Sequence, residues 1–267
     1  MSYLSLNGTQ LYYEEKGRGQ PIIFIHGVWM SGRFFQKQLD YFAQRYRTII
    51  LDLRGHGRSA QAHSGHTIAN YARDLHGLMQ GLELANVVLV GWSMGAFVIW
   101  DYLKQFGTKN VKATVIVDES ASDLKTPDWP LGIFDFQSLC HLMANVQTDR
   151  ETVVREFIPE MFQKEPDEAD VRWMFDEMTR LPESVASAIL FDQTLQDYRP
   201  VLSSFTVPTL LCFGSDEKLC PVAAGEHLHQ SLPNTQLIVF EQSGHCPFLE
   251  EPARFNQEVH NFIQSLR

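Results

Sequence analysis

The stretch Gly91-Trp92-Ser93-Met94-Gly95 decides the fold, because an apolar run precedes it and a helical pattern follows it. The run Val-Val-Leu-Val at 87–90 predicts a short buried strand, and apolar side chains over 96–103 predict a helix. A serine on so sharp a turn needs a strained backbone, and glycines two positions to either side remove side chains that would collide. The turn would lift the Ser93 hydroxyl above the sheet at a helix N-terminus, which predicts a nucleophile.

A serine nucleophile needs a base and an acid from elsewhere in the chain, because its hydroxyl reacts poorly until a base removes the proton. Asp216 follows the apolar run 208–213, and His245 follows the run 236–240. Both would lie on loops that leave the carboxyl ends of strands, where open α/β sheets gather their chemistry. The sequence therefore predicts a triad of Ser93 as nucleophile, His245 as base and Asp216 as acid.

Five landmarks resemble those of the α/β-hydrolase family, in the family's order and over nearly the whole chain. They are the strand and oxyanion-loop motif at 22–27, the turn at 52–59, the serine elbow at 91–95, the Gly-Ser-Asp segment at 214–216 and the Gly-His segment at 244–252. The chain most resembles the cofactor-independent chloroperoxidases, arylesterases and carboxylesterases, so the resemblance implies that no cofactor is needed. Members with strong perhydrolase activity tend to have a proline just after the His-Gly motif, where this chain has Val28-Trp29-Met30.

Asp118 is the alternative acid. It ends the strand-like run 115–117, a position that some relatives of this fold use for the triad carboxylate. Glu217 neighbours Asp216 but would point the other way in an extended segment. Asp216 is favoured because its Gly-Ser-Asp context matches the commoner pattern of the family.

Strand and helix patterns alternate along the chain, which predicts an α/β fold of the α/β-hydrolase type: a mostly parallel eight-stranded sheet with helices on both faces. Asn7-Gly8 predicts an antiparallel first hairpin. Residues 121–200 interrupt the alternation with helical patterns only. They predict a helical lid inserted after the sixth strand, whereas 1–120 and 201–267 form the core.

The predicted lid suggests a substrate pocket and its charge. Between 121 and 200 there are 16 Asp and Glu against 7 Lys and Arg, nearly the whole net charge of the protein. One interpretation is that these acidic residues lie on solvated outer faces of the helices. The alternative is that they create a negative potential around the mouth of the pocket, which would repel anionic substrates. Five aromatic side chains are candidates to wall an apolar pocket: Trp29, Trp129, Phe134, Phe136 and Trp173.

The predicted chemistry is ester hydrolysis through an acyl-enzyme, with the backbone N–H groups of Val28 and Met94 as the oxyanion hole. His26 is expected to brace the oxyanion loop and not to act as a base. The expected substrates are neutral short-to-medium acyl esters or lactones. Three alternatives remain open on the same triad: a low-turnover ligand sensor, a perhydrolase or cofactor-free haloperoxidase, and a carbon–carbon-bond hydrolase.

Composition limits the partners and the cellular compartment that we expect for this protein. The formal charge of −10 argues against nucleic acid or an anionic membrane as partner. The first eight residues lack the basic and apolar regions of a signal peptide, and four cysteines in a chain of 267 residues favour free thiols, so a cytoplasmic protein is expected. The pairs His63/His66 and His227/His229 have no convincing further ligand, so no metal is expected. A monomer and a homo-oligomer are both open.

Overall fold

A single eight-stranded sheet runs through the protein, whose computed structural model describes residues 2–266. The strands lie side by side in the order β1-β2-β4-β3-β5-β6-β7-β8. Their bounds are β1 Ser2–Leu6, β2 Thr9–Lys16, β3 Pro21–Ile25, β4 Arg47–Leu51, β5 Val87–Trp92, β6 Val111–Val117, β7 Thr209–Gly214 and β8 Thr235–Phe240.

The sheet is mostly parallel, as predicted. β1 and β2 pair antiparallel through a turn in which Asn7 and Gly8 both have positive φ, and β2 also runs antiparallel to β4. All the other pairings are parallel. The central strand β5 is buried along its whole length, as expected of a parallel strand that is covered on both faces.

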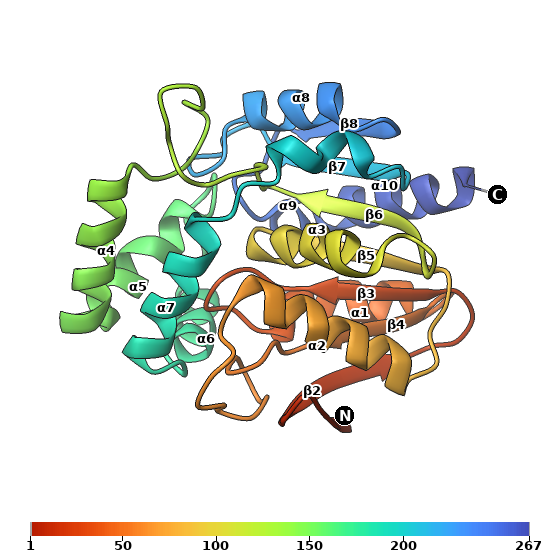
Figure 1. Ribbon diagram of the computed structural model, residues 1–267, viewed down its shortest axis with the longest axis horizontal. Coiled ribbons are helices and arrows are strands. Elements are labelled where there is room, and N and C mark those ends of the chain that lie inside the picture. The colour runs from red at the N-terminus through yellow and green to blue at the C-terminus, as the bar shows by residue number, and fades with distance from the viewer. Residues whose placement is uncertain (1, 267) are drawn as a thin grey trace.

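Helices cover both faces of this sheet (Figure 1). On one face α2 (Ile68–Gly81) packs against α3 (Met94–Phe106), and on the other α1 (Gln36–Phe42) packs against α10 (Pro252–Ser265). α8 (Val222–Ser231) packs against β7 and β8. Three short helical turns complete this part of the fold: η1 Gly32–Phe35, η2 Arg199–Ser204 and α9 Pro247–Glu250.

Four helices are inserted between β6 and β7, and we refer to them as the inserted helices. They are α4 Phe136–Thr148, α5 Arg150–Glu160, α6 Glu168–Met178 and α7 Glu183–Thr194. Aspartates cap the first three, since Asp135, Asp149 and Asp167 each accept a hydrogen bond from a backbone N–H three residues on. The inserted helices lie beyond the carboxyl ends of the parallel strands, at the left of Figure 1.

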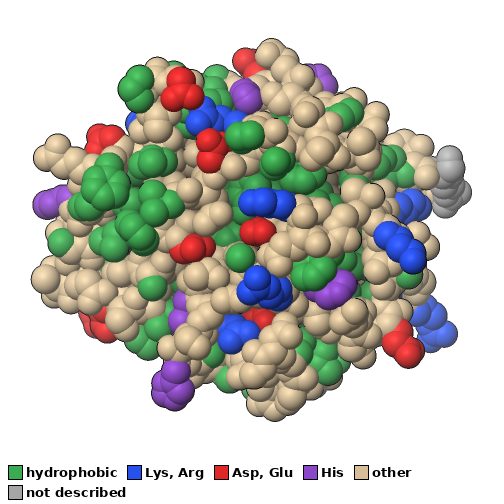
Figure 2. All heavy atoms as spheres, viewed as in Figure 1, with side chains coloured by type: hydrophobic (Ala, Val, Ile, Leu, Met, Phe, Trp, Pro, Cys, Tyr) green, Lys and Arg blue, Asp and Glu red, His purple; other side chains and the backbone are tan. Residues whose placement is uncertain are grey.

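The outer surface of the inserted helices is partly apolar. Figure 2 shows hydrophobic side chains gathered over this part of the molecule. Phe136, Phe191 and Leu195 are large apolar side chains that are exposed here. Within the described residues, no helix combines the length and the apolar character needed to cross a bilayer.

Candidate active site

Ser93 stands on the turn between β5 and α3 with φ 52° and ψ −126°. A residue other than glycine rarely adopts such a conformation, and the cost persists only where the surroundings hold it. Gly95 lets the turn approach β3, because a Cβ there would lie 2.2 Å from the carbonyl oxygen of Ile25. The strained conformation of Ser93 is therefore maintained by the close packing of α3 against β3.

His245 lies on the loop after β8, and backbone contacts fix that loop from two sides. The indole Nε1 of Trp92 donates to the carbonyl of His245 at 2.8 Å, and the two rings lie 5.5 Å apart. The backbone N–H of His245 donates to the carbonyl of Met161 at 2.9 Å. The imidazole is thus held beside the strand that carries the serine.

Glu217, and not Asp216, holds the imidazole of His245. The Nδ1 atom of His245 lies 2.7 Å from Oε2 of Glu217, and both side chains are buried. Asp216 is exposed to solvent. The prediction of Asp216 as the partner of His245 therefore disagrees with the geometry.

Glu217 takes the place predicted for Asp216 because the chain forms a turn here and not an extended segment. After β7 the chain bends at 215–216, and the N–H groups of Ser215 and Asp216 donate to the carbonyls of Phe240 and Ser243. The bend needs Gly214, because a Cβ there would lie 2.0 Å from the carbonyl oxygen of Gly244. Alternation of side chains fails across such a turn, so the residue after Asp216 faces the imidazole.

Several N–H groups donate hydrogen bonds to the carboxylate of Glu217. Its Oε1 accepts hydrogen bonds from the backbone N–H groups of Leu219, at 2.6 Å, and Cys220, at 3.2 Å. Burial acts to raise the pKa of Glu217, but His245 and these two N–H groups outweigh burial and lower it. Glu217 therefore stays ionised at neutral pH.

Asp118, the alternative acid, has a different partner. It follows β6, is fully buried, and its Oδ1 accepts the backbone N–H of Gly214 at 2.9 Å. It makes no hydrogen bond to His245 among the described residues. Asp118 is thus hydrogen-bonded to the end of β7 and not to His245.

The loop after β3 carries the predicted oxyanion donors. Gly27 lies against the serine, since a Cβ there would be 3.2 Å from Cβ of Ser93. Within residues 2–266, the backbone N–H groups of Val28 and Met94 have no hydrogen-bond partner, so both are free to donate to a ligand.

His26 braces this loop. Its Nε2 accepts the N–H of Leu53 at 3.0 Å, which leaves the Nδ1 proton to be donated to the carbonyl of Gly27 at 2.8 Å. Burial lowers the pKa of His26 to about 4, so the imidazole is neutral at physiological pH. A neutral ring with both nitrogens engaged is unsuited to act as a base.

A cavity of about 270 Å³ opens beside Ser93. Its wall is mostly apolar and is shared between the core and the inserted helices. The lining side chains are Val28, Trp29, Ile133, Phe134, Leu142, Asn145, Val153, Glu156, Phe157, Glu160, Leu190, Gln193 and Leu219. Of the five aromatic residues predicted to wall a pocket, the structure places Trp29 and Phe134 here.

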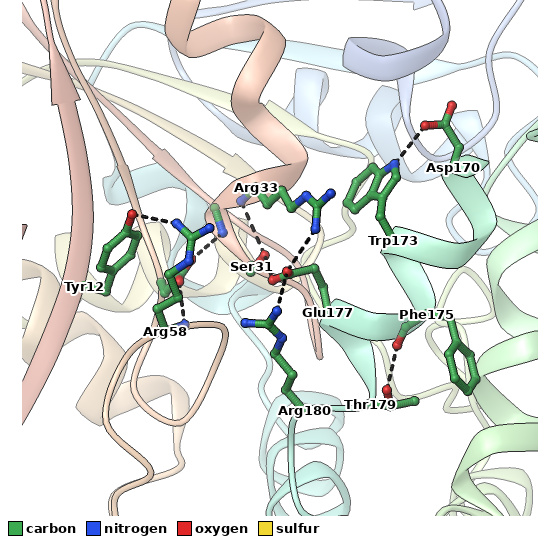
Figure 3. Close-up of polar contacts among 12 residues, drawn as sticks. Tyr12, Ser31, Arg33, Arg58, Asp170, Trp173, Phe175, Glu177, Thr179 and Arg180 are labelled. Atoms are coloured by element: carbon green, nitrogen blue, oxygen red, sulfur yellow. Dashed lines mark hydrogen bonds and ion pairs between the residues drawn. The ribbon is translucent and has the colours of Figure 1, made fainter. Parts of the chain in front are cut away.

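The other three predicted pocket residues lie elsewhere. Trp129 lies in the segment between β6 and α4, and the other two lie on helices, where a helical pattern does not tell which side faces the serine. Phe136 begins α4 and is 58% exposed. Trp129 packs against His227 and Arg199. Trp173 on α6 donates to Asp170 at 2.8 Å, beneath the guanidinium of Arg33 (Figure 3).

Two hydrogen bonds fasten the inserted helices to the oxyanion loop. Trp29, which has φ 65°, donates from Nε1 to the carbonyl of Ala186 on α7 at 3.0 Å. Two residues on, Ser31 donates from Oγ to the buried Glu177 of α6 at 2.7 Å (Figure 3). The inserted helices, and not the core alone, therefore hold the segment beside the oxyanion donors.

Two acidic side chains in the cavity wall were not predicted individually. Glu156 and Glu160 are one turn apart on α5, both line the cavity, and both are exposed, so they mark its solvent side. A spacing of four residues on an acidic helix was the only signal in the sequence.

Comparison with known proteins identifies the family of this fold. The model of the alpha/beta hydrolase family matches residues 22–258. Over 96% of this chain and 97% of its own length, a non-heme chloroperoxidase of Kitasatospora aureofaciens is 28% identical. An esterase of Exiguobacterium antarcticum superposes with a TM-score of 0.94 and 27% identity, covering 98% of this chain and 99% of its own. A bromoperoxidase of Bacillus anthracis superposes with a TM-score of 0.92 and 27% identity, covering 96% of each chain.

Proposed function

The chain belongs to the alpha/beta hydrolase family, and from that premise we propose that it is a serine hydrolase of carboxylic esters with Ser93, His245 and Glu217 as its triad. The observation that carries the proposal is the buried contact of 2.7 Å between His245 and Glu217. Trp92, which precedes the strained Ser93, donates to the carbonyl of His245, and Ser93 itself lines an apolar cavity. Such a constellation activates a hydroxyl for acyl transfer.

In the proposed reaction Ser93 attacks the ester carbonyl while His245 takes its proton. Glu217 holds the Nδ1 proton of the imidazole and stabilises its positive form. The alcohol leaves with the proton from His245, and water then cleaves the acyl-enzyme by the same path. The N–H groups of Val28 and Met94 hold the oxyanion that forms in each half of the reaction.

The cavity sets the proposed substrate class. Its apolar wall favours a short-to-medium acyl chain or a lactone, at ~0.8 kcal/mol for each CH₂ buried. Glu156 and Glu160 add negative charge on its solvent side, which disfavours an anionic substrate. We extend the proposal to residues 121–200 as a lid that closes this cavity.

The proposed setting is the cytoplasm. Cys140, Cys212, Cys220 and Cys246 are all unpaired, which suits a reducing compartment. The proposed partner is the small-molecule substrate alone, without nucleic acid or membrane.

A panel of substrates tests the proposal. We expect turnover of neutral aryl esters and lactones at or above ~1 s⁻¹, and loss of at least ~10⁴-fold in kcat for Ser93→Ala. A serine-directed phosphonate should label Ser93 in the native chain and nothing in Ser93→Ala. Turnover far below ~1 s⁻¹ on every ester would favour a ligand sensor. Residual activity of Ser93→Ala within tenfold of wild type would remove the triad from the proposal.

A second candidate follows from the names of two of the similar proteins given above, a chloroperoxidase and a bromoperoxidase. The panel therefore includes halogenation dependent on peroxide and a carboxylic acid. Faster halogenation than ester hydrolysis at matched substrate concentration would favour the perhydrolase on the same triad.

A further inference from the structure

A second carboxyl group lies directly behind the triad. Asp118 leaves the end of β6 with φ 45°, a left-handed conformation that is unfavourable for most residues other than glycine. Its N–H donates to the carbonyl of Cys212 and its Oδ1 accepts from Gly214, both at 2.9 Å. The side chain is thereby clamped to β7 just before the loop that carries Glu217.

Among the described residues, one oxygen of Asp118, Oδ2, is buried without a hydrogen-bond donor, and Glu217 lies close to this side chain. The side chains of Asp118 and Glu217 are close enough to hydrogen-bond to each other. Two buried carboxylates cannot share such a contact while both are charged, so one proton must lie between them.

The donors decide which group carries that proton. Glu217 already receives three N–H hydrogen bonds, from His245, Leu219 and Cys220, and all three favour its charged form. Asp118 receives one, from Gly214. Burial raises the pKa of Asp118 well above its ordinary value, and the negative charge of Glu217 adds to the effect.

We propose that Asp118 is a positioning residue, a neutral carboxylic acid that donates a hydrogen bond from Oδ2 to Glu217 and so fixes the carboxylate that orients His245. The proposal rests on the triad proposed above. Asp118 lies beneath Glu217 and acts through it, without touching the substrate.

Burial raises the pKa of both Asp118 and its neighbour Glu119 well above the ordinary value, and of the two only Asp118 is within hydrogen-bonding reach of Glu217. Glu217 and Glu250 act on Asp118 from the loop after β7 and from α9. Three thiols near it are buried, Cys212, Cys220 and Cys246, and burial raises the pKa of each well above its ordinary value. When Asp118 ionises at alkaline pH, repulsion from Glu217 should displace that carboxylate and lower kcat.

The test compares Asp118→Asn with Asp118→Ala over pH 6–10. Asparagine keeps both hydrogen bonds, since its Oδ1 can accept from Gly214 and its amide can donate to Glu217. We expect Asp118→Asn to keep kcat within about threefold of wild type and to lose the alkaline fall in activity. Asp118→Ala should lower kcat at least about tenfold with KM nearly unchanged.

Glu119→Gln is the matched control, because Glu119 is also a buried carboxyl group at the end of β6 but has no hydrogen bond to Glu217. It should keep the activity and the alkaline fall of the wild type. If Asp118→Asn loses as much kcat as Asp118→Ala, or keeps the alkaline fall, Asp118 is not a neutral donor and the proposal is wrong.

Infrared difference spectra decide the matter even if Asp118→Ala does not fold. The wild type minus Asp118→Asn should show one protonated-carboxyl band at neutral pH that disappears as the alkaline fall sets in. Absence of that band would overturn the proposal. Failure of the triad itself has a separate signature, because Glu217→Gln and Ser93→Ala would then retain activity whatever Asp118→Asn does.

Discussion

The carboxyl edge of the sheet and the inserted helices hold their polar groups in different ways. At the edge, Glu217 and His26 are buried, and each of their side chains engages partners on both sides. The inserted helices reach the oxyanion loop through two polar contacts, at Trp29 and Ser31, and expose apolar side chains such as Phe136. The sheet edge therefore holds its polar side chains in fixed positions, whereas the inserted helices shape the wall of the cavity.

This difference assigns separate tasks to the two regions. A group that must keep a proton at one atom needs low mobility and a defined set of donors, which the strand ends supply. A wall that selects among substrates needs shape and charge, and these tolerate change. Changes at the edge should lower kcat steeply, while changes in the inserted helices should alter which substrate is preferred.

The largest expected effect separates two neighbouring carboxylates. Glu217→Gln should lower kcat by at least ~10³-fold, because a neutral partner no longer stabilises the charged imidazole. Asp216→Asn should stay within about twofold of wild type, since Asp216 is exposed. Steady-state rates on a neutral aryl ester measure both. The reverse ranking would return the acid to Asp216.

The second prediction concerns acid stability at the edge. The pKa of His26 falls from 6.5 to about 4 on folding, so the unfolded chain binds the proton first. The stability due to neutral His26 is complete above pH 6.5 and is lost as pH falls from 6.5 to 4, by at most about 3 kcal/mol.

Denaturant unfolding of wild type and His26→Asn at pH 7.5 and 4.0 measures this contribution. The wild-type advantage in unfolding free energy should shrink at the lower pH. The control His63→Asn, at an exposed histidine, should show no such change. A constant difference between wild type and His26→Asn would mean that His26 is not the titrating group.

The third prediction tests the link between the two regions. Trp29→Phe keeps an aromatic wall but removes the hydrogen bond to Ala186, so the neighbouring Val28 N–H should be less well fixed. We expect kcat to fall about 3- to 10-fold with a smaller change in KM. The control Trp173→Phe loses its hydrogen bond to Asp170 outside the cavity and should leave kcat unchanged. Equal falls in kcat for the two variants would mean that the hydrogen bond of Trp29 does not support the oxyanion hole.

The smallest expected effect concerns charge in the cavity wall. Replacing Glu156 and Glu160 by Gln should raise kcat/KM for an anionic ester about 3- to 10-fold relative to a neutral ester of equal length. The gain should shrink at high salt, which screens exposed charge. Glu168→Gln, on α6 outside this cavity, is the control. A gain that salt does not change would point to desolvation in place of charge.

Sequence by itself determined the fold and two members of the proposed triad. Alternating strand and helix patterns predict a mostly parallel sheet, because each pattern reports burial along its own element. The strained turn at Ser93 and the strand-end position of His245 are likewise local features. The position of His26 in the oxyanion-loop motif also predicts that it braces this loop.

Only the tertiary structure decided which carboxylate meets His245 and which aromatics reach the cavity. The turn at 215–216 depends on hydrogen bonds to Phe240 and Ser243, residues about 25 positions later in the chain, so no local alternation could assign Glu217. Trp173 on α6 and Phe157 on α5 are both aromatic residues of inserted helices, yet only Phe157 lines the cavity. Which side of an inserted helix faces the serine depends on packing against distant elements, and that information is absent from the helix's own sequence.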